Sequence, residues 1–271
     1  VNGQSDRVVT GLVAAPAVVG QVGIGSQVAE SGRQVAAAPL VPLTNRFATL
    51  HGEGDDEALH RTFRQTDRTW CLALAGGVVV ATACAAPLVR AWLGAGYDDA
   101  EAFAAMLVLA YGANLVLGVR FAYLRATGRA NLEASAGVLL MVLNLVCTVP
   151  LAIAFGAWGV VGGTLAAYLL ATGWLSTRFH RVAPEVQVLH PRELVRPLAV
   201  ALVAAGAAGA WGMFAAGAVP AGWALVPVGL GAAAGWLAYL AVCLGVRPTP
   251  AGLRAMLRPD QERGTSTTQA P

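Results

Sequence analysis

Apolar stretches of roughly 20 residues recur along almost the whole chain, and short polar gaps separate them. A hydrocarbon core about 30 Å thick requires about 20 helical residues, because each residue adds about 1.5 Å to the length of a helix. Six stretches meet this requirement, and each is predicted to form a transmembrane helix: residues 70–93, 100–124, 132–155, 157–177, 197–219 and 223–246.

Two further apolar runs precede these six and contain prolines. The first covers residues 8–29, and Pro16 near its middle removes one backbone hydrogen bond and favours a kink. The second is shorter and covers residues 34–50. Residues 30–33, Glu-Ser-Gly-Arg, are interpreted as a polar turn between them. The sequence thus predicts an all-α, polytopic helical membrane protein with about eight transmembrane helices.

The polar segments between the runs are mostly short. In residues 51–68, Leu59 and Phe63 stand at helical spacing among charged neighbours, which predicts an amphipathic segment on the membrane surface. Residues 178–196 form a longer polar link. The tail, residues 247–271, is polar and is predicted to be a disordered cytoplasmic segment.

All 18 basic residues are arginines, and their positions predict the orientation of the helices. When eight spans are threaded in order, 16 arginines fall on one side, and only Arg33 and Arg90 fall on the other. The positive-inside rule assigns the arginine-rich side to the cytoplasm. We therefore expect a multi-pass protein of the inner (plasma) membrane with both termini in the cytoplasm.

The composition narrows the possible classes of protein and of binding partner. Hydrophobic residues make up 56% of the chain and charged residues 12%, against about 25% charged in an average soluble domain. No basic stripe alternates with aromatic residues, so a nucleic-acid partner is not expected. The lipid bilayer is the expected environment. Four cysteines lie singly inside apolar runs and are interpreted as small buried side chains.

Five polar residues in or beside the apolar runs are candidates for the wall of a substrate cavity: Asn45, Arg46, Asn114, Arg120 and Asn144. A charge at the bilayer centre costs about 2.5–3.5 kcal/mol on insertion scales, so an arginine there indicates a function. Arg120 either reaches the interface as an anchor or lines the cavity, and Arg46 has the same two interpretations. The asparagines also suit hydrogen bonds between helices. Glu30 and Arg33 are interpreted as a solvated pair in the outer turn.

Residues for catalysis are not found. The four histidines lie in polar links without the spacing of metal ligands. The sequence contains no nucleophile elbow, phosphate-binding loop or dinucleotide fingerprint. We therefore expect no enzyme activity, no catalytic residue, no metal and no cofactor.

The order of several short motifs resembles a known transporter family. These motifs are Asn-Gly-Gln-Ser-Asp-Arg at 2–7, Pro-Leu-Val-Pro at 39–42, the segment from Ala86 to Tyr97, Ala-Thr-Gly-Arg at 126–129, and Asn144 followed by Phe-Gly-Ala-Trp-Gly at 155–159. The chain resembles the multidrug/oligosaccharidyl-lipid/polysaccharide flippase superfamily, in its polysaccharide transporter branch. The likeness is to the C-terminal lobe of such a transporter plus two extra helices.

This resemblance implies a domain organisation. Residues 1–179 would form a MATE-like second lobe of six helices, residues 180–246 two additional transmembrane helices, and residues 247–271 the tail. Family members enclose a central cavity between two lobes. The resemblance therefore implies an N-terminal lobe that this sequence lacks, either on the same polypeptide or as a partner.

The resemblance also implies a function, in which the protein moves an undecaprenyl-linked oligosaccharide to the outer leaflet by alternating access. Cationic side chains such as Arg46 or Arg120 would hold the pyrophosphate. A multidrug/cation antiporter of the same superfamily is one alternative, although the predicted spans contain almost no acidic residues, which favours an anionic substrate. A partner subunit without transport activity, or a gene remnant, is the alternative from another class.

Overall fold

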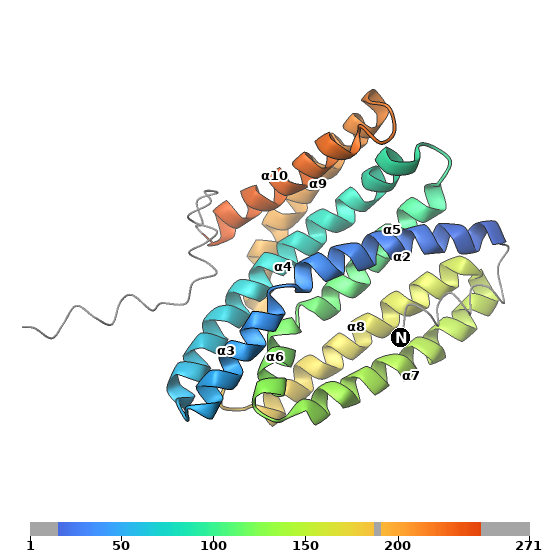
Figure 1. Cartoon of the computed structure of the whole chain (residues 1–271). Helices are drawn as coiled ribbons and strands as arrows, with labels where there is room; N and C mark the ends of the chain where they lie inside the picture. The colour runs from blue at the N-terminus through green and yellow to red at the C-terminus, as the bar shows by residue number, and fades with distance from the viewer. Residues whose placement is uncertain (1–15, 187–190, 245–271) are drawn as a thin grey trace, which may run out of the picture.

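The structure is a computed structural model that describes residues 16–186 and 191–244, and every regular element in these ranges is helical (Figure 1). In chain order the elements are α2 (Pro16–Ala37), α3 (Leu40–Gly52), α4 (Asp56–Leu93), α5 (Asp98–Leu115), α6 (Gly118–Ala126), α7 (Ala130–Phe155), α8 (Ala157–Val182), the 3-10 helix η1 (Pro191–Leu194), α9 (Val195–Ala218) and α10 (Leu225–Leu244). The prediction of an all-helical protein is confirmed.

Six helical segments of the described chain are long and apolar enough to cross a membrane: Asp56–Leu93, Asp98–Ala126, Ala130–Phe155, Ala157–Val182, Val195–Ala218 and Leu225–Cys243. They correspond to the six predicted apolar stretches, and together they support a polytopic membrane protein. The two predicted N-terminal spans are not among them, so the predicted count of eight is not confirmed.

The predicted polar turn at residues 30–33 is wrong, because α2 continues through it to Ala37. Nothing in Glu-Ser-Gly-Arg forbids a helix, and Glu30 and Arg33 stabilise one through a contact three residues apart. The break comes later, at Pro39. Proline lacks the backbone N–H and disfavours helical geometry in the residue before it, so the second predicted run is divided between α2 and α3.

The amphipathic segment predicted at residues 51–68 is likewise not a separate element on the membrane surface. Its residues after the turn at Gly54 form the first turns of α4, which runs without interruption to Leu93. The Asp55 carboxylate accepts the Ala58 N–H at 2.9 Å and caps the helix, and Asp56 and Glu57 favour this end electrostatically. The residues that start α4 therefore precede the apolar run in the sequence.

Two broken helices run side by side and in the same direction. α2 and α3 form one path interrupted at Ala38 and Pro39, and α5 and α6 form another interrupted at Val116 and Leu117 (Figure 1). The two breaks meet where Leu40 packs on Gly118; a Cβ on this glycine would lie only 2.6 Å from the Leu40 Cδ1 atom.

Helix α4 separates two hairpins. The α9–α10 pair packs on one side of it and α5 on the other, while α7 and α8 pack on each other and α8 on α5 (Figure 1). Glycines allow the close approaches. At Gly163 of α8 a Cβ would lie 2.6 Å from the Thr148 Cα atom of α7, and at Gly76 of α4 it would overlap the Tyr239 ring of α10. Helices α9 and α10 lie within residues 180–246, and the predicted division into domains stays a prediction. The tail 247–271 and Arg7 lie outside the described residues.

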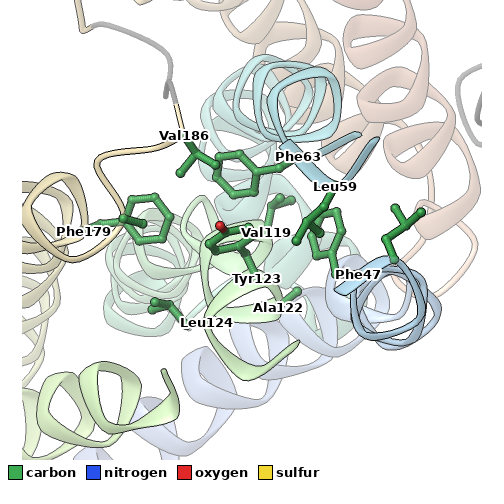
Figure 2. Packing of buried hydrophobic residues seen from close by; sticks show 11 residues of the cluster. Phe47, Leu59, Phe63, Val119, Ala122, Tyr123, Leu124, Phe179 and Val186 are labelled. Atoms are coloured by element: carbon green, nitrogen blue, oxygen red, sulfur yellow. The ribbon is translucent and has the colours of Figure 1, made fainter. Parts of the chain in front are cut away.

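An aromatic cluster closes the end of the bundle where α3 and α6 finish. Tyr123 of α6 lies between Phe63 of α4, Phe47 of α3 and Phe179 of α8 (Figure 2). Its ring centroid is 4.9 Å from that of Phe63 and 6.3 Å from that of Phe179. Leu59 and Phe63, the apolar residues of the predicted surface segment, are therefore buried in protein.

Arginines gather at this same end. Within the described ranges, Arg90 alone lies at the opposite end and Arg33 lies between the two ends (Figure 1). The others are Arg46, Arg61, Arg64, Arg68, Arg120, Arg125, Arg129, Arg178, Arg181, Arg192 and Arg196. The charge asymmetry predicted from the sequence is retained, but α2 and α3 make one passage along the bundle rather than two. The described start of α2 is therefore at the end opposite to the end of α10 (Figure 1).

Candidate functional site

Helix α2 has surfaces of different character. One face packs against α5, with Val22 and Ala29 buried beside Phe103 and Leu107. The rest of the helix surface presents polar side chains, which we call the α2 polar face: Gln27, Glu30, Ser31, Arg33 and Gln34. All of these except the half-buried Glu30 are exposed in the described structure. Arg33, four residues after Ala29, stands at the edge of this surface next to the packed face.

An ion pair dominates the α2 polar face. The Arg33 Nε atom donates to Glu30 Oε2 at 2.9 Å, and Arg33 Nη2 donates to Glu30 Oε1 at 2.6 Å. Gln34 Nε2 donates to the same Oε1 atom at 3.2 Å. The side chains of Arg33 and Glu30 are 45% and 38% exposed, so both charged groups are open to whatever lies beside α2.

This ion pair lies at mid-height of the bundle. Glu30 and Arg33 are near the middle of the helical path from Pro16 to Gly52. Arg33 is close enough to Tyr111 of α5 and Tyr168 of α8 for an electrostatic interaction with each. The two tyrosine rings contact each other with centroids 5.2 Å apart, and Tyr168 is near the middle of α8.

The other outward-facing helices are different. Helix α7 exposes Leu145 (62%) and Ile153 (76%), and α9 and α10 expose Val203 (75%) and Leu230 (65%). Such surfaces suit lipid chains. The α2 polar face does not suit lipid chains, because a charged group at the bilayer centre costs about 2.5–3.5 kcal/mol on insertion scales. At this height, the α2 polar face fits water or a polar protein surface.

A second ion pair is buried near the basic end. Arg120 of α6 donates from Nε to Asp67 Oδ1 of α4 at 3.2 Å, and from Nη2 to Oδ2 at 3.5 Å. The residues are 6% and 1% exposed. The Arg120 guanidinium also lies 5.8 Å from the centroid of the Phe179 ring. This arrangement holds α6, the short half of a broken helix, against α4.

The interruption between α5 and α6 leaves backbone carbonyls without helical partners, and α4 supplies donors for them. Trp70 Nε1 donates to the Leu115 carbonyl at 3.0 Å, and the Cys71 thiol is 3.8 Å from the Val116 carbonyl. In a low-dielectric interior an unpaired carbonyl is costly. The donors of α4 therefore stabilise the break between α5 and α6, which is not a frayed helix end.

The five predicted cavity residues lie on four different helices, α3, α5, α6 and α7. Asn45 is exposed on α3, and the Nε atom of the adjacent Arg46 is buried without a hydrogen-bond partner. Asn114 is half-buried at the break of α5. Asn144 is buried in α7, where its Oδ1 atom accepts from the Thr148 hydroxyl at 2.6 Å.

The Arg120 guanidinium is closed off from solvent in the described structure, since both members of its ion pair with Asp67 are buried. Its two interpretations, anchoring at the interface and lining a cavity, both stay predictions. The assignment of Asn45, Arg46, Asn114 and Asn144 to a cavity stays a prediction. Among the described residues, no group of three His, Cys, Asp or Glu side chains is arranged to hold a metal ion.

The predicted local pair of Glu30 and Arg33 is confirmed, but its placement in an outer turn is wrong. A sequence signal for the correct placement existed. Gln27, Ser31 and Gln34 recur at three- and four-residue spacing across the supposed turn. Val22 and Ala29 recur on the other face. This is the pattern of an amphipathic helix that continues past residue 33.

Comparison with protein-family models, curated proteins and solved structures finds no match to the chain. The resemblance to the flippase superfamily therefore stays a prediction.

Proposed function

We propose that this chain is the C-terminal part of an alternating-access membrane transporter, and that the α2 polar face lines its substrate path. The observation that carries the proposal is the Glu30–Arg33 ion pair, open at mid-height of a bundle whose other outward-facing helices are apolar. Intramembrane ionisable groups mark substrate or ion paths more often than they serve stability.

The proposed substrate is an undecaprenyl-linked oligosaccharide used in cell-surface polysaccharide biosynthesis. Its sugar and pyrophosphate would pass along the α2 polar face while its isoprenoid tail stays in the hydrocarbon. Arg33 suits the pyrophosphate, because a guanidinium binds phosphate oxygens through two N–H groups. In this proposal Arg33 takes the role that the resemblance implies for Arg46 or Arg120.

The proposal includes a membrane orientation. The end of the bundle that carries most of the described arginines faces the cytoplasm of the inner (plasma) membrane, by the positive-inside rule. The start of α2 then lies on the outer side, in contrast to the orientation predicted from eight spans. The α2 polar face would meet an N-terminal lobe across a hydrated gap, and rocking of the two lobes would move the opening between the sides.

Glu30 also favours a second candidate, a multidrug/cation antiporter of the same superfamily. The sequence argument against this function was the scarcity of acidic residues in the spans. Glu30 and Asp67 both lie within helices of the bundle, and Glu30 is open. A carboxylate at this height could exchange a proton for a cationic drug. The two candidates differ in whether Arg33 or Glu30 contacts the substrate.

The test uses inside-out membrane vesicles from cells that make the chain at its native level, since these vesicles contain any partner it has. Translocation of a labelled undecaprenyl-linked oligosaccharide is expected to fall at least tenfold with Arg33→Gln, the effect of losing a charged contact worth about 1.5–3 kcal/mol. Arg125→Gln is the matched control, because Arg125 pairs with Glu133 at the basic end of the bundle.

Unchanged translocation in the Arg33→Gln vesicles would contradict the flippase proposal. Loss of drug efflux with Glu30→Gln in the same vesicles, with oligosaccharide translocation unaffected, would establish the antiporter instead.

A further inference from the structure

The arginines at the basic end of the bundle differ in their partners. Several of them contact a carboxylate or an aromatic ring: Arg61, Arg120, Arg125, Arg129 and Arg178. Others are exposed and have no hydrogen bond, ion pair or ring contact with any described residue: Arg64, Arg68, Arg181 and Arg196. The guanidinium groups of this second set are open to a ligand from outside the chain.

Arg68 of α4 and Arg196 of α9 lie at the same level of the bundle. The two helices run side by side, and a series of buried clusters joins them in the same order along both (Figure 1). In the cluster nearest the basic end, Ala73 of α4 packs against a group that contains Ala201 of α9. Each arginine stands five residues before one of these alanines, about 7.5 Å along its helix. The two arginines therefore lie on neighbouring helices at one height.

Both arginines stand at the border between polar and apolar sequence. Arg68 comes just before the apolar stretch 70–93, and Arg196 just before the stretch 197–219. In the proposed orientation this border faces the cytoplasm, so both residues lie at the level of the lipid phosphates of the cytoplasmic leaflet. Anionic lipids give that leaflet a negative surface, which attracts arginines beside it.

An apolar groove lies between α9 and α10, further into the membrane. Its volume is about 500 Å³, it is open along one side, and alanine and glycine make up most of its wall. Ala207 in this wall comes 11 residues after Arg196, so the two residues share one face of α9 and are about 16 Å apart along it. Half of the hydrocarbon core is about 15 Å thick. A lipid chain that begins at the level of Arg196 therefore reaches the groove.

We propose that Arg68 and Arg196 bind the phosphate of an anionic phospholipid of the cytoplasmic leaflet, and that one acyl chain of this lipid lies in the groove between α9 and α10. Guanidinium groups suit this role because they bind phosphate oxygens through two hydrogen bonds. The site is on the side of α4 opposite to α5, on which α2 packs, so it is separate from the proposed substrate path (Figure 1). The inference takes only the membrane orientation from the proposed function.

The charges around the site favour a headgroup with net negative charge over a zwitterionic one. Next to Arg68 in the sequence, Asp67 is buried in its ion pair with Arg120. Glu193, one turn before Arg196, has an interaction of its own, and Arg196 is not part of it. The positive charges of Arg68 and Arg196 are therefore left for the lipid.

The test measures lipid binding to the full chain in detergent by native mass spectrometry. Phosphatidylglycerol and phosphatidylcholine with the same acyl chains are added separately, so that the two probes differ only in their headgroups. We expect one phosphatidylglycerol to bind at least about tenfold more tightly than phosphatidylcholine. Glycerol 3-phosphate, which has the phosphate without acyl chains, should bind at least about tenfold more weakly than phosphatidylglycerol, because it leaves the groove empty.

Four variants separate the two parts of the site. Arg68→Gln/Arg196→Gln should bind phosphatidylglycerol about 25-fold more weakly, since each arginine beside an anionic lipid contributes about fivefold. Arg68→Lys/Arg196→Lys keeps both charges and should retain most of the affinity, which shows that the loss in the glutamine variant does not reflect misfolding. Arg181→Gln removes an exposed, unpaired arginine of α8 and should match the unmodified chain. Ala207→Phe fills the groove and should weaken phosphatidylglycerol binding without changing that of glycerol 3-phosphate.

Equal affinity of the unmodified chain for the two phospholipids would overturn the site. An equal loss per substituted arginine in Arg181→Gln and in the double glutamine variant would overturn it too, because it would indicate a general attraction of the basic end to anionic lipids. Phosphatidylglycerol binding that Ala207→Phe leaves unchanged would overturn the placement of the acyl chain. These outcomes are independent of oligosaccharide translocation by Arg33→Gln vesicles, so failure of the lipid site is distinguishable from failure of the proposed function.

Discussion

Arg120 Nε donates to Asp67 Oδ1 across 3.2 Å, and this buried contact joins the short half of a broken helix to α4. Removal of one partner leaves an uncompensated charge in the protein interior. Asp67→Ala is expected to destabilise the chain by about 3–5 kcal/mol. Unfolding in mixed micelles, followed by circular dichroism, measures this loss.

The matched control for Asp67→Ala is Glu133→Ala, which removes the partner of Arg125 from a pair whose arginine side chain is 55% exposed. This change should cost about 0–1 kcal/mol, since water and salt screen exposed charges. A similar small loss for Asp67→Ala would mean that the Arg120 guanidinium reaches water, and would contradict its buried position.

Trp70→Phe tests the hydrogen bond at the break between α5 and α6. The substitution keeps an aromatic ring but leaves the Leu115 carbonyl without the indole donor, now 3.0 Å away. A buried carbonyl without a donor costs about 1–3 kcal/mol, so the same unfolding measurement should show a loss of this size. Trp92→Phe, at a tryptophan that is 45% exposed, should change stability little. Equal effects of the two substitutions would contradict the proposed capping of the break.

Two glycines of α8 should respond in opposite directions to alanine. A Cβ at Gly163 would lie 2.6 Å from the Thr148 Cα atom, so Gly163→Ala must push α7 away and is expected to cost about 1–3 kcal/mol. At Gly173 no atom lies within 4 Å of the Cβ position. There alanine should stabilise the helix by about 0.5–1 kcal/mol. Melting temperatures in detergent distinguish the two variants, and a stabilising Gly163→Ala would contradict the α7–α8 packing.

Glu185, which follows α8, predicts a dependence of stability on pH. Burial raises its pKa, but hydrogen bonds from its own backbone amide, from Arg129 and from Tyr123 outweigh burial and hold the pKa below its usual value. A lowered folded-state pKa stabilises the protein above the unfolded-state value, and this contribution disappears as the pH falls through the folded-state value.

The difference in melting temperature between the unmodified chain and Glu185→Gln should therefore be largest near neutral pH and vanish in acid. Glu57→Gln, at a side chain that is 91% exposed, should show no such trend. A difference for Glu185→Gln that grows as the pH falls would contradict the assignment.

The apolar helices could be predicted from the sequence because their length and hydropathy carry the signal locally. Helices α7, α8 and α9 have nearly the predicted extents, and Gly156, with a φ of 60°, ends α7 at the gap between the predicted stretches 132–155 and 157–177. The break at Leu117 and the pairing of Asp67 with Arg120 could not be predicted in this way. The ion pair joins residues 53 positions apart, and the hydrogen bonds at the break join residues 45 positions apart.

The N-terminal region was misread for a different reason. Glu30 and Arg33 suggested a surface turn, because charged residues in a membrane protein usually lie outside the bilayer. In the proposed function the α2 polar face lies toward water at mid-height of the membrane, which departs from that rule. Departures from sequence rules are expected at functional sites, because binding there requires residues that the local environment does not favour.

The most direct test of the central claim is the access of water to the α2 polar face. In a background with the four native cysteines replaced by alanine, Ser31→Cys and Leu145→Cys are compared for their reaction with a charged, membrane-impermeant thiol reagent in native membranes. Both positions are exposed in the structure, one on the α2 polar face and one on the apolar face of α7. Fast labelling at position 31 and none at position 145 is the expected result. Equal lack of labelling at both positions would place α2 in lipid or against a dry partner surface, and would contradict a hydrated substrate path.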